Sequence, residues 1–444
     1  MKTRHWLWLI LAGSVLLRGF AALLLGNQVL PLPGIFDQIS YHTLSTRVLD
    51  GHGFTFATQW WPMTRAGEPT AHWSFLYTLY LAAVYAIFGI NPLVARILQA
   101  IIVGIAGPWL VYRLALATFQ SRVPAHSSSD SARQVALLAA AWFAVYGYFI
   151  YYAAALMTEA FFIISILWSL DCALRILKDG KLLLFLELGL ALGITVLLRQ
   201  TYFLFVPFIM IWLVWGNRRM KDHPIAWRTL MWGSLATILI LVLLVAPFTY
   251  YNSRRFGHFV LLNTNAGFAF FWANHPVHGV KFEPLYTTEM PSYQDVIPGE
   301  LRDLDEAALD KQLMKVGIKF VLDDPARFFV LTLSRIPKHF LFWPLAGSSL
   351  PSNLTRVLSI GLALPFMIAG GWLWFQDVRK GSIFLETGLL LVLFICIYVG
   401  LHLVSWASVR YRLPTDAVGL VFAARALHQM LRRLKIPLFK YATF

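Results

Sequence analysis

The chain has 444 residues, of which 58% are hydrophobic and 13% are charged, whereas an ordinary soluble domain carries about 25% charged residues. This composition excludes most classes of soluble protein. Lys and Arg number 37 against 22 Asp and Glu, and the net charge of +15 leaves two classes of partner open, nucleic acids and anionic membranes.

Long apolar segments decide in favour of the membrane, because about 20 apolar residues are enough to cross a bilayer. The first, residues 6–26, follows the basic sequence MKTRHW and has no small-residue cleavage site after it, so we expect a membrane span rather than a removed signal peptide. Further spans are predicted near 93–113, 135–153, 160–177, 182–198, 202–216, 229–249, 354–375, 383–403 and 413–430. The expected fold class is an all-α polytopic membrane protein, without a nucleic-acid partner.

Residues 75–90 are also apolar but short for a span, and the distribution of Lys and Arg decides how they are interpreted. If this segment does not cross, nearly all the basic residues of the connecting segments share one side with both termini. If it crosses, nearly all of them move to the other side. We therefore expect a juxtamembrane or re-entrant helix at 75–90 and two cytoplasmic termini.

This topology divides the chain into three parts. Residues 1–249 form a transmembrane module that includes an exterior loop, 27–92. Residues 250–353 form an exterior region, and residues 354–444 contain the last spans and a cytoplasmic tail. Charged and apolar residues alternate at helical spacing over 298–329, which predicts helices in the exterior region.

Asp37 is the first candidate functional residue, because an ionisable side chain beside the hydrocarbon layer is energetically costly. It lies directly after the first span, at the predicted outer surface. A carboxylate near an apolar boundary can have a raised pKa and act as a general base toward a hydroxyl or an amine. The alternative is that Asp37 caps the helix that begins there.

Glu159 is a second carboxylate at the predicted outer side, at the end of the third span. It could join Asp37 in ordering an acceptor, a water molecule or a divalent cation. Alternatively, it is an acidic residue favoured by the dipole at a helix start.

His72, with Glu68 nearby, and His275 could ligate a metal ion together with a carboxylate. Their spacing is not a recognised metal signature, so ordinary hydrogen bonding or contact with an acceptor is favoured over a metal role. The identity of any metal is left open.

Three arginines are predicted to face outward, against the usual distribution of positive charge: Arg199, Arg410 and Arg412. Guanidinium groups bind phosphate in a bidentate manner, so these residues are candidates for binding a lipid phosphate. Snorkelling of a long side chain toward the interface is the alternative.

These residues occur within a series of motifs that resembles a known family. In order, the motifs are Asp37 with Tyr41, GHGF (51–54), PTAHWSFLYTLYLAAVYAIFG (69–89) with Arg96 beyond it, LLRQ (197–200), FGHFVLLNTNAGFAFFWANHP (256–276) and YRLP (411–414). Together they resemble bacterial GT-C glycosyltransferases, nearest to the family 39-like protein mannosyltransferase and aminoarabinose transferase superfamily. The resemblance covers most of the chain.

The resemblance implies a GT-C bundle of about 10–11 transmembrane helices, with juxtamembrane helices in the first exterior loop and a second long exterior loop. It also implies inverting transfer of a sugar from a polyprenyl-phosphate donor to a glycan, lipid or protein acceptor, at the outer face of the bacterial plasma membrane. Asp37 would be the catalytic base and Arg199, with Arg410 and Arg412, would bind the donor phosphate. The acceptor or metal site would contain Glu159, Gln38, Tyr41, Glu68, His72 and His275.

One position departs from the family pattern. Many relatives follow the catalytic Asp with a second acidic residue, whereas Gln38 stands here and cannot serve as an anionic ligand. A divalent metal ion is therefore left open as a cofactor. Two other functions also stay open from the sequence, a transporter or flippase of lipid-linked saccharides and a catalytically silent scaffold.

Overall fold

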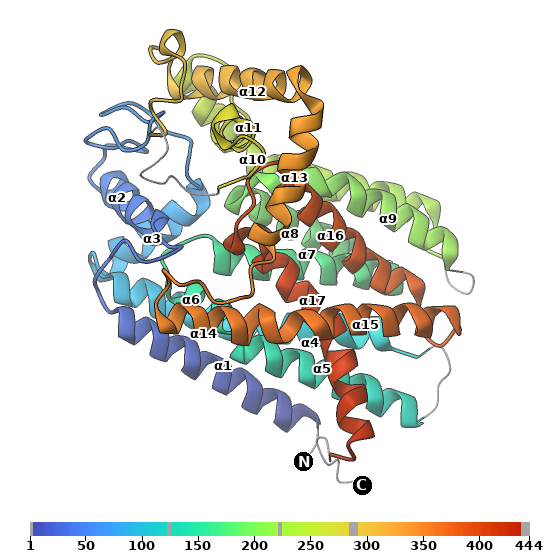
Figure 1. Ribbon diagram of the computed structural model, residues 1–444. Helices are drawn as coiled ribbons and strands as arrows, with labels where there is room; N and C mark the ends of the chain where they lie inside the picture. Colours follow the sequence, from blue (N-terminus) through green and yellow to red (C-terminus); the bar gives the residue numbers. More distant parts are fainter. Residues whose placement is uncertain (1–2, 122–125, 221–223, 284–291, 437–444) are drawn as a thin grey trace.

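The computed structural model describes residues 3–121, 126–220, 224–283 and 292–436. Within these ranges the chain is helical, with isolated β-bridges and no strands. Helices of one bundle fill most of the molecule, and a smaller group of helices lies at the end of the bundle remote from both termini (Figure 1). The predicted all-α fold class is confirmed.

Seven helical segments of the described residues are long and apolar enough to cross a membrane. They are α1 (Thr3–Leu25), α4 (Pro92–Phe119), α7 (Glu159–Asp179), η1 with α9 (Gln200–Phe205, Val206–Arg219), α10 (Trp227–Phe256), α14 to α15 (Leu350–Arg356, Leu362–Arg379) and α16 (Leu385–Val404). A bent pair, α5 (His126–Val145) and α6 (Gly147–Ala154), would add an eighth. The chain is a multi-pass membrane protein.

Two predicted spans are helices that are not both long enough and apolar enough to be counted among these segments. The first, α8 (Leu182–Leu198), is apolar but has only 17 residues. The second, α17 (Val409–Arg433), has 25 residues but carries charged side chains along its length. Both belong to the bundle, since α8 packs against α7 and α10, and α17 packs against α4, α5, α7, α15 and α16. The segment predicted as juxtamembrane is α3 (Phe75–Phe88), whose 14 residues extend only about 21 Å.

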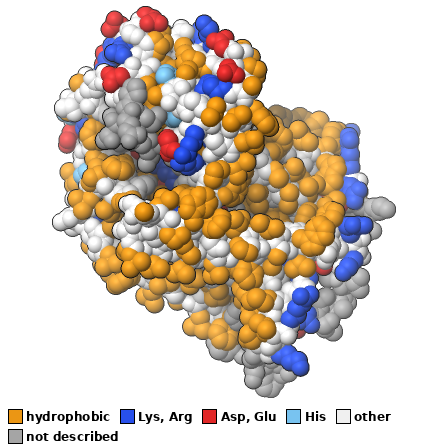
Figure 2. All heavy atoms as spheres, viewed as in Figure 1, with side chains coloured by type: hydrophobic (Ala, Val, Ile, Leu, Met, Phe, Trp, Pro, Cys, Tyr) orange, Lys and Arg blue, Asp and Glu red, His pale blue; other side chains and the backbone are white. Residues whose placement is uncertain are grey.

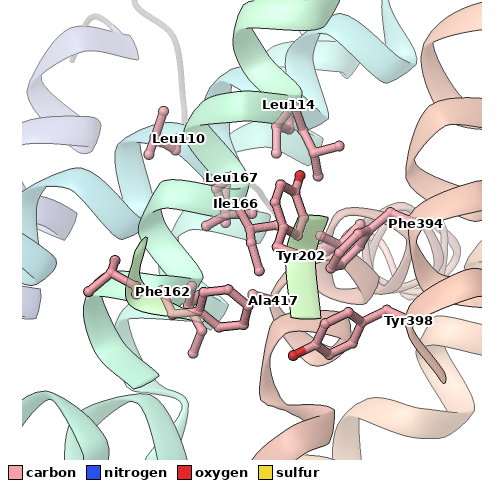
Figure 3. Close-up of a cluster of buried hydrophobic side chains, with 14 of the residues drawn as sticks. Leu110, Leu114, Phe162, Ile166, Leu167, Tyr202, Phe394, Tyr398 and Ala417 are labelled. Carbon is pink, nitrogen blue, oxygen red and sulfur yellow. The ribbon is translucent and has the colours of Figure 1, made fainter. Parts of the chain in front are cut away.

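A cluster of buried apolar side chains holds the bundle together (Figure 3). Its members from α4, α7, η1, α16 and α17 include Leu110, Phe162, Ile166, Tyr202, Phe394, Tyr398 and Ala417. Close packing also requires a glycine where α15 meets α17. A Cβ added to Gly370 would lie 1.8 Å from the carbonyl oxygen of Phe422, so only glycine permits the two helices to approach this closely.

The outer surface of the bundle is apolar and its charges are unevenly placed. Figure 2 shows a broad hydrophobic band, with Lys and Arg side chains gathered along the right and lower right edges. Large apolar side chains are exposed on the helices of the bundle, among them Leu16, Phe20, Trp232, Ile368 and Trp372. An uncovered apolar surface of this size is typical of a membrane protein.

The smaller group of helices contains α2 (Asp37–Leu49), α11 (Ala266–Asn274), α12 (Glu306–Asp323) and α13 (Pro325–His339). Its core includes Met63, Phe268, Phe271, Trp272, Ile297, Leu309 and Leu313. Asp305 caps α12 by accepting a hydrogen bond from the backbone N–H of Ala308 at 2.8 Å, and Asp324 caps α13 through Arg327 at 2.9 Å. The helices predicted within 298–329 are therefore present.

Candidate active site

Asp37 and Arg410 form an ion pair between the first turn of α2 and the first turn of α17. Arg410 Nη1 donates to Asp37 Oδ2 at 2.7 Å. No side chain caps the start of α2, so the capping interpretation of Asp37 is wrong. Its side chain keeps 36% of its surface accessible, which leaves room for a substrate to reach it.

The charge state of Asp37 differs from the sequence-based expectation. Burial opposes ionisation of the carboxylate, but the charge of Arg410 and its hydrogen bond more than offset this, with a further contribution from Arg199. The pKa of Asp37 therefore lies below its usual value, not above it. Asp37 is an ionised group that can accept a proton but is held as a weak base while Arg410 is in place.

Glu159 and Arg199 form a second ion pair beside the first. Arg199, which ends α8, hydrogen-bonds to the carboxylate of Glu159 and donates to Thr158 Oγ1 at 3.1 Å. Arg410 Nε also lies 3.7 Å from Glu159 Oε1. The Glu159 side chain is only 3% exposed, and it lies against both guanidinium groups. We call Asp37, Glu159, Arg199 and Arg410 the charge cluster.

Tyr411 lies against both arginines of the charge cluster. The guanidinium carbon of Arg410 is 4.9 Å from the centre of the Tyr411 ring, and that of Arg199 is 5.2 Å away. Arg410 Nη2 also donates to the Tyr411 hydroxyl at 3.0 Å. The imidazole ring of His402 stacks on the Tyr411 ring, with the ring centres 4.9 Å apart and an interplanar angle of 7°. Tyr411 therefore fixes the direction of both cations.

Two other predicted residues lie near the charge cluster. Tyr41 is buried, and burial together with the negative charges of Asp37 and Glu159 raises its pKa. His72 packs against the Trp61 and Trp73 rings. Burial lowers the pKa of His72 to about 4, although the charge of Asp37 opposes the shift, so His72 is neutral at pH 7.

Four predicted residues do not join the charge cluster. Gln38 donates to the Leu30 carbonyl oxygen and accepts from Arg96 Nη2 at 3.1 Å. Glu68 is exposed. His275 Nδ1 accepts from the Val277 N–H at 3.1 Å. Among the described residues, none of these three side chains bonds to a member of the charge cluster.

Arg412, the fourth, was expected to face outward, and this expectation is wrong. Its side chain is fully buried, with Nε 2.9 Å from Asp416 Oδ1 and Nη1 donating to the His339 carbonyl oxygen at 2.6 Å. Tyr146 donates its hydroxyl to the same Asp416 at 2.8 Å. Arg412 therefore joins helices inside the bundle and does not contribute to the outer face.

Glu306 is a carboxylate that the sequence did not single out. It accepts hydrogen bonds from Thr64 Oγ1 at 2.5 Å, Thr70 Oγ1 at 2.7 Å, Thr264 Oγ1 at 2.5 Å and the Ala71 N–H at 2.7 Å. Burial raises its pKa to about 7. Glu306 thereby fastens the loop that carries His72 to the start of α12.

The donor set does not fit a divalent metal ion. Among the described residues, no group of three or more His, Cys, Asp or Glu side chains is close enough to hold one. The two carboxylates that could serve as oxygen ligands are already paired with Arg410 and Arg199. A cation would have to displace both guanidinium groups, which is unfavourable in a partly buried site.

An apolar cavity of about 620 Å³ lies between α3, α4, α7 and α8. Its walls include the side chains of Tyr77, Tyr80, Trp109, Phe161 and Leu198. Phe161 follows Glu159 by two residues, and Leu198 directly precedes Arg199. At the start of α7 and the end of α8, the cavity lining therefore adjoins the charge cluster along the chain. This lining suits a hydrocarbon chain.

No protein-family model matches the chain, and no curated protein matches its sequence. Among solved structures, it is similar to the oligosaccharyltransferase AglB from Archaeoglobus fulgidus in complex with an inhibitory peptide and a dolichol-phosphate (TM-score 0.55, 14% identity, 98% of this chain and 51% of that chain). The apo form of the Archaeoglobus fulgidus oligosaccharyltransferase gives a TM-score of 0.56 at 14% identity, over 97% of this chain and 51% of that chain. ArnT from Cupriavidus metallidurans bound to undecaprenyl phosphate gives a TM-score of 0.42 at 13% identity, over 98% of this chain and 79% of that chain.

These similarities establish the fold. The chain spans about half the length of the archaeal transferase, and its sequence identity to that protein is low. The predicted GT-C type of bundle is confirmed. The chemistry has to be argued from the charge cluster and the cavity.

Proposed function

We propose that the protein is an inverting glycosyltransferase that moves a sugar from a polyprenyl-phosphate donor to a glycan, lipid or protein acceptor. The observation that carries this proposal is the charge cluster, in which a reachable carboxylate and two arginines stand beside an apolar cavity. Such a reaction needs one group that accepts a proton from the acceptor and cations that stabilise the departing phosphate. The related fold of the oligosaccharyltransferase solved with a dolichol-phosphate supports the same class of donor.

The donor would bind with its isoprenoid chain in the apolar cavity and its phosphate at Arg199 and Arg410. The phosphodiester of the donor carries one negative charge, and a second develops as the bond to the sugar breaks. Guanidinium groups held by Tyr411 are already directed before the reaction begins, so little reorganisation is needed to stabilise that charge.

Asp37 would act on the acceptor. Its carboxylate takes the proton from an acceptor hydroxyl or amine, whose lone pair forms the new bond to the anomeric carbon. The electron pair of the old bond leaves with the polyprenyl phosphate. A single displacement of this kind inverts the anomeric configuration.

Donor binding and base strength are coupled in this arrangement. Arg410 holds the pKa of Asp37 down and would also contact the donor phosphate. When the phosphate draws Arg410 away, Asp37 loses its counterion and becomes a stronger base. The base is then activated only when a donor is present.

The orientation follows from the basic residues. We propose that the edge of the bundle along which Lys and Arg gather in Figure 2 faces the cytoplasm of a bacterial cell, with both termini on that side. The charge cluster would then lie at the outer face of the plasma membrane.

The proposal is tested by incubating the purified protein with defined polyprenyl-phosphate sugars and candidate acceptors and measuring release of polyprenyl phosphate. Asp37→Asn should abolish release while donor binding persists, and Glu68→Gln, at an exposed carboxylate of the same exterior loop, should behave as wild type. Full activity of Asp37→Asn would exclude Asp37 as the base. Movement of the lipid-linked sugar across a bilayer without release of polyprenyl phosphate would favour a flippase.

A further inference from the structure

A second polar site lies at the opposite end of α17 from the charge cluster. Arg410 is in the first turn of this helix, and Arg432 and Arg433 are in its last turn, about 33 Å further along the axis. A cavity of about 420 Å³ opens there between the ends of α15 and α17. Four basic side chains line it, Lys380, Arg425, Arg432 and Arg433.

The charges in this cavity are unbalanced. Asp377 is the carboxylate among the lining side chains. It forms an ion pair with Arg425, whose Nε and Nη2 lie 3.0 Å and 2.9 Å from Asp377 Oδ2. In the described part of the chain, no carboxylate lies within ion-pair distance of Lys380, Arg432 or Arg433. The positive charges of Lys380, Arg432 and Arg433 therefore repel one another across the cavity unless an anion lies between them.

The lining suits a phosphate group. Arginine forks and a lysine ammonium are the usual ligands of phosphate oxygens. The side-chain amides of Gln376 and Gln429 also line the cavity and can add uncharged donors. The Asp377–Arg425 pair joins the two helices and keeps the walls of the cavity in place without an added ligand.

The surroundings indicate a lipid as the source of the phosphate. Leu373 lines the cavity, and the exposed side chains of α15 continue from it as an apolar surface, with Ile368 67% and Trp372 60% exposed. An acyl chain could lie along this surface while its headgroup enters the cavity. Anionic lipids are attracted to basic residues at the cytoplasmic leaflet, by about 1 kcal/mol for each Lys or Arg near the surface.

We infer that this cavity binds the phosphate headgroup of an anionic lipid, at the membrane face opposite the proposed active site. Lys380, Arg432 and Arg433 contact the phosphate, and the acyl chains pack along α15. The site does not depend on glycosyl transfer, because none of its residues belongs to the charge cluster.

The experiment is native mass spectrometry of the full chain in neutral detergent, titrated with phosphatidylglycerol, phosphatidylcholine or inorganic phosphate. The test variant is Lys380→Gln/Arg432→Gln/Arg433→Gln. The matched control is Lys178→Gln/Lys181→Gln/Arg218→Gln, which removes the same charge from exposed positions that do not line the cavity. Wild type and control should retain one phosphatidylglycerol in preference to phosphatidylcholine, and the test variant should bind it roughly tenfold more weakly or worse.

Two outcomes would overturn the assignment in whole or in part. Equal affinity of the test variant and the control for phosphatidylglycerol would exclude the cavity as the site. Binding of inorganic phosphate as tight as that of phosphatidylglycerol, and lost in the test variant, would keep the anion site but exclude the lipid as its source. If the triple variant does not yield folded protein, Arg433→Glu, at an exposed position, makes the same comparison.

Discussion

Arg410 Nη1 lies 2.7 Å from Asp37 Oδ2, and the same guanidinium group approaches Glu159 Oε1 to 3.7 Å. One arginine therefore contacts both carboxylates of the charge cluster. Any ligand that binds Arg410 changes the environment of the proposed base. The pH dependence of activity reports this relationship.

Replacing Arg410 with Gln should move the acid limb of the kcat/KM profile to higher pH. In the wild type, Arg410 keeps the pKa of Asp37 below its usual value, so the limb lies below about pH 3.9. Without Arg410, the charge of Arg199 opposes the effect of burial less completely, and the pKa of Asp37 rises. The profile is measured from release of polyprenyl phosphate at subsaturating donor.

Arg410→Lys is the matched control, because it keeps the positive charge and loses the guanidinium fork. Its acid limb should stay at low pH. Superimposable limbs in the Gln and Lys variants would mean that Asp37 does not set the profile.

Replacing Arg199 should weaken donor binding. Arg199→Gln alone leaves the 3% exposed carboxylate of Glu159 with a weaker partner and should lower stability, since breaking a buried pair costs about 3–5 kcal/mol. The double variant Arg199→Gln/Glu159→Gln removes both charges and should recover most of the stability. Its apparent donor affinity should still fall roughly tenfold or more, because a charged hydrogen bond to phosphate contributes about 1.5–3 kcal/mol.

Thermal unfolding and donor titration of the single and double variants separate the two effects. Recovery of donor affinity together with stability in the double variant would show that Arg199 acts on folding only.

Tyr411 should contribute to activity mainly through its ring. Tyr411→Phe keeps the surface against which Arg199 and Arg410 lie and loses only the hydroxyl that accepts from Arg410. Tyr411→Ala loses both cation–π contacts, each of which contributes about 0.5–2 kcal/mol. We expect Ala to lower kcat/KM for the donor by roughly tenfold or more and Phe to lower it much less. Equal losses in the two variants would assign the role to the hydroxyl.

Glu306 should make the stability of the smaller group of helices depend on pH. Its pKa is raised to about 7 in the folded protein, against about 4.3 in an unfolded chain. Between about pH 4.3 and 7, Glu306 is therefore more protonated in the folded state than in the unfolded chain. The free energy of unfolding should fall as pH rises through this range. Glu306→Gln should flatten this dependence, and Glu300→Gln, at an exposed position, should not. The measurement is the midpoint of thermal unfolding at each pH, and equal slopes in all three proteins would contradict it.

Gly370 and Gly371 offer a test of the contact between α15 and α17. A Cβ at Gly370 would lie 1.8 Å from the Phe422 carbonyl oxygen, whereas one at Gly371 would meet nothing within 4 Å. Gly370→Ala should therefore destabilise the protein by about 1–3 kcal/mol, and Gly371→Ala should not. The measurement is the midpoint of thermal unfolding of the two variants in the same detergent. Equal midpoints would contradict the close packing of α15 and α17.

The sequence was most informative where chemistry and membrane position conflict. A charged side chain beside an apolar span needs a reason, and this argument selected Asp37, Glu159, Arg199 and Arg410. It could not show which charge pairs with which, because the partners come from α2, α7, the end of α8 and α17. For the same reason the low pKa of Asp37 was missed.

Arg410 and Arg412 show why a shared motif does not give a shared role. On a helix, residues two apart point to different sides, so Arg410 reaches the charge cluster while Arg412 enters the bundle and pairs with Asp416. Tyr411, between them, lies in the same motif but has no charge to draw attention to it. Glu306 follows the helix cap Asp305 and could not be told from an ordinary acidic residue in a first turn.

Among the described helices α17 is the last, and it supplies Arg410 373 residues after Asp37. During synthesis, Asp37 and Glu159 would reach the membrane long before the arginine that joins them. A nascent chain that ends before α17 can contain the apolar cavity and both carboxylates but not the complete charge cluster. The proposed activity would then begin only when α17 docks, so that nascent chains without α17 would not consume the proposed lipid-linked donor.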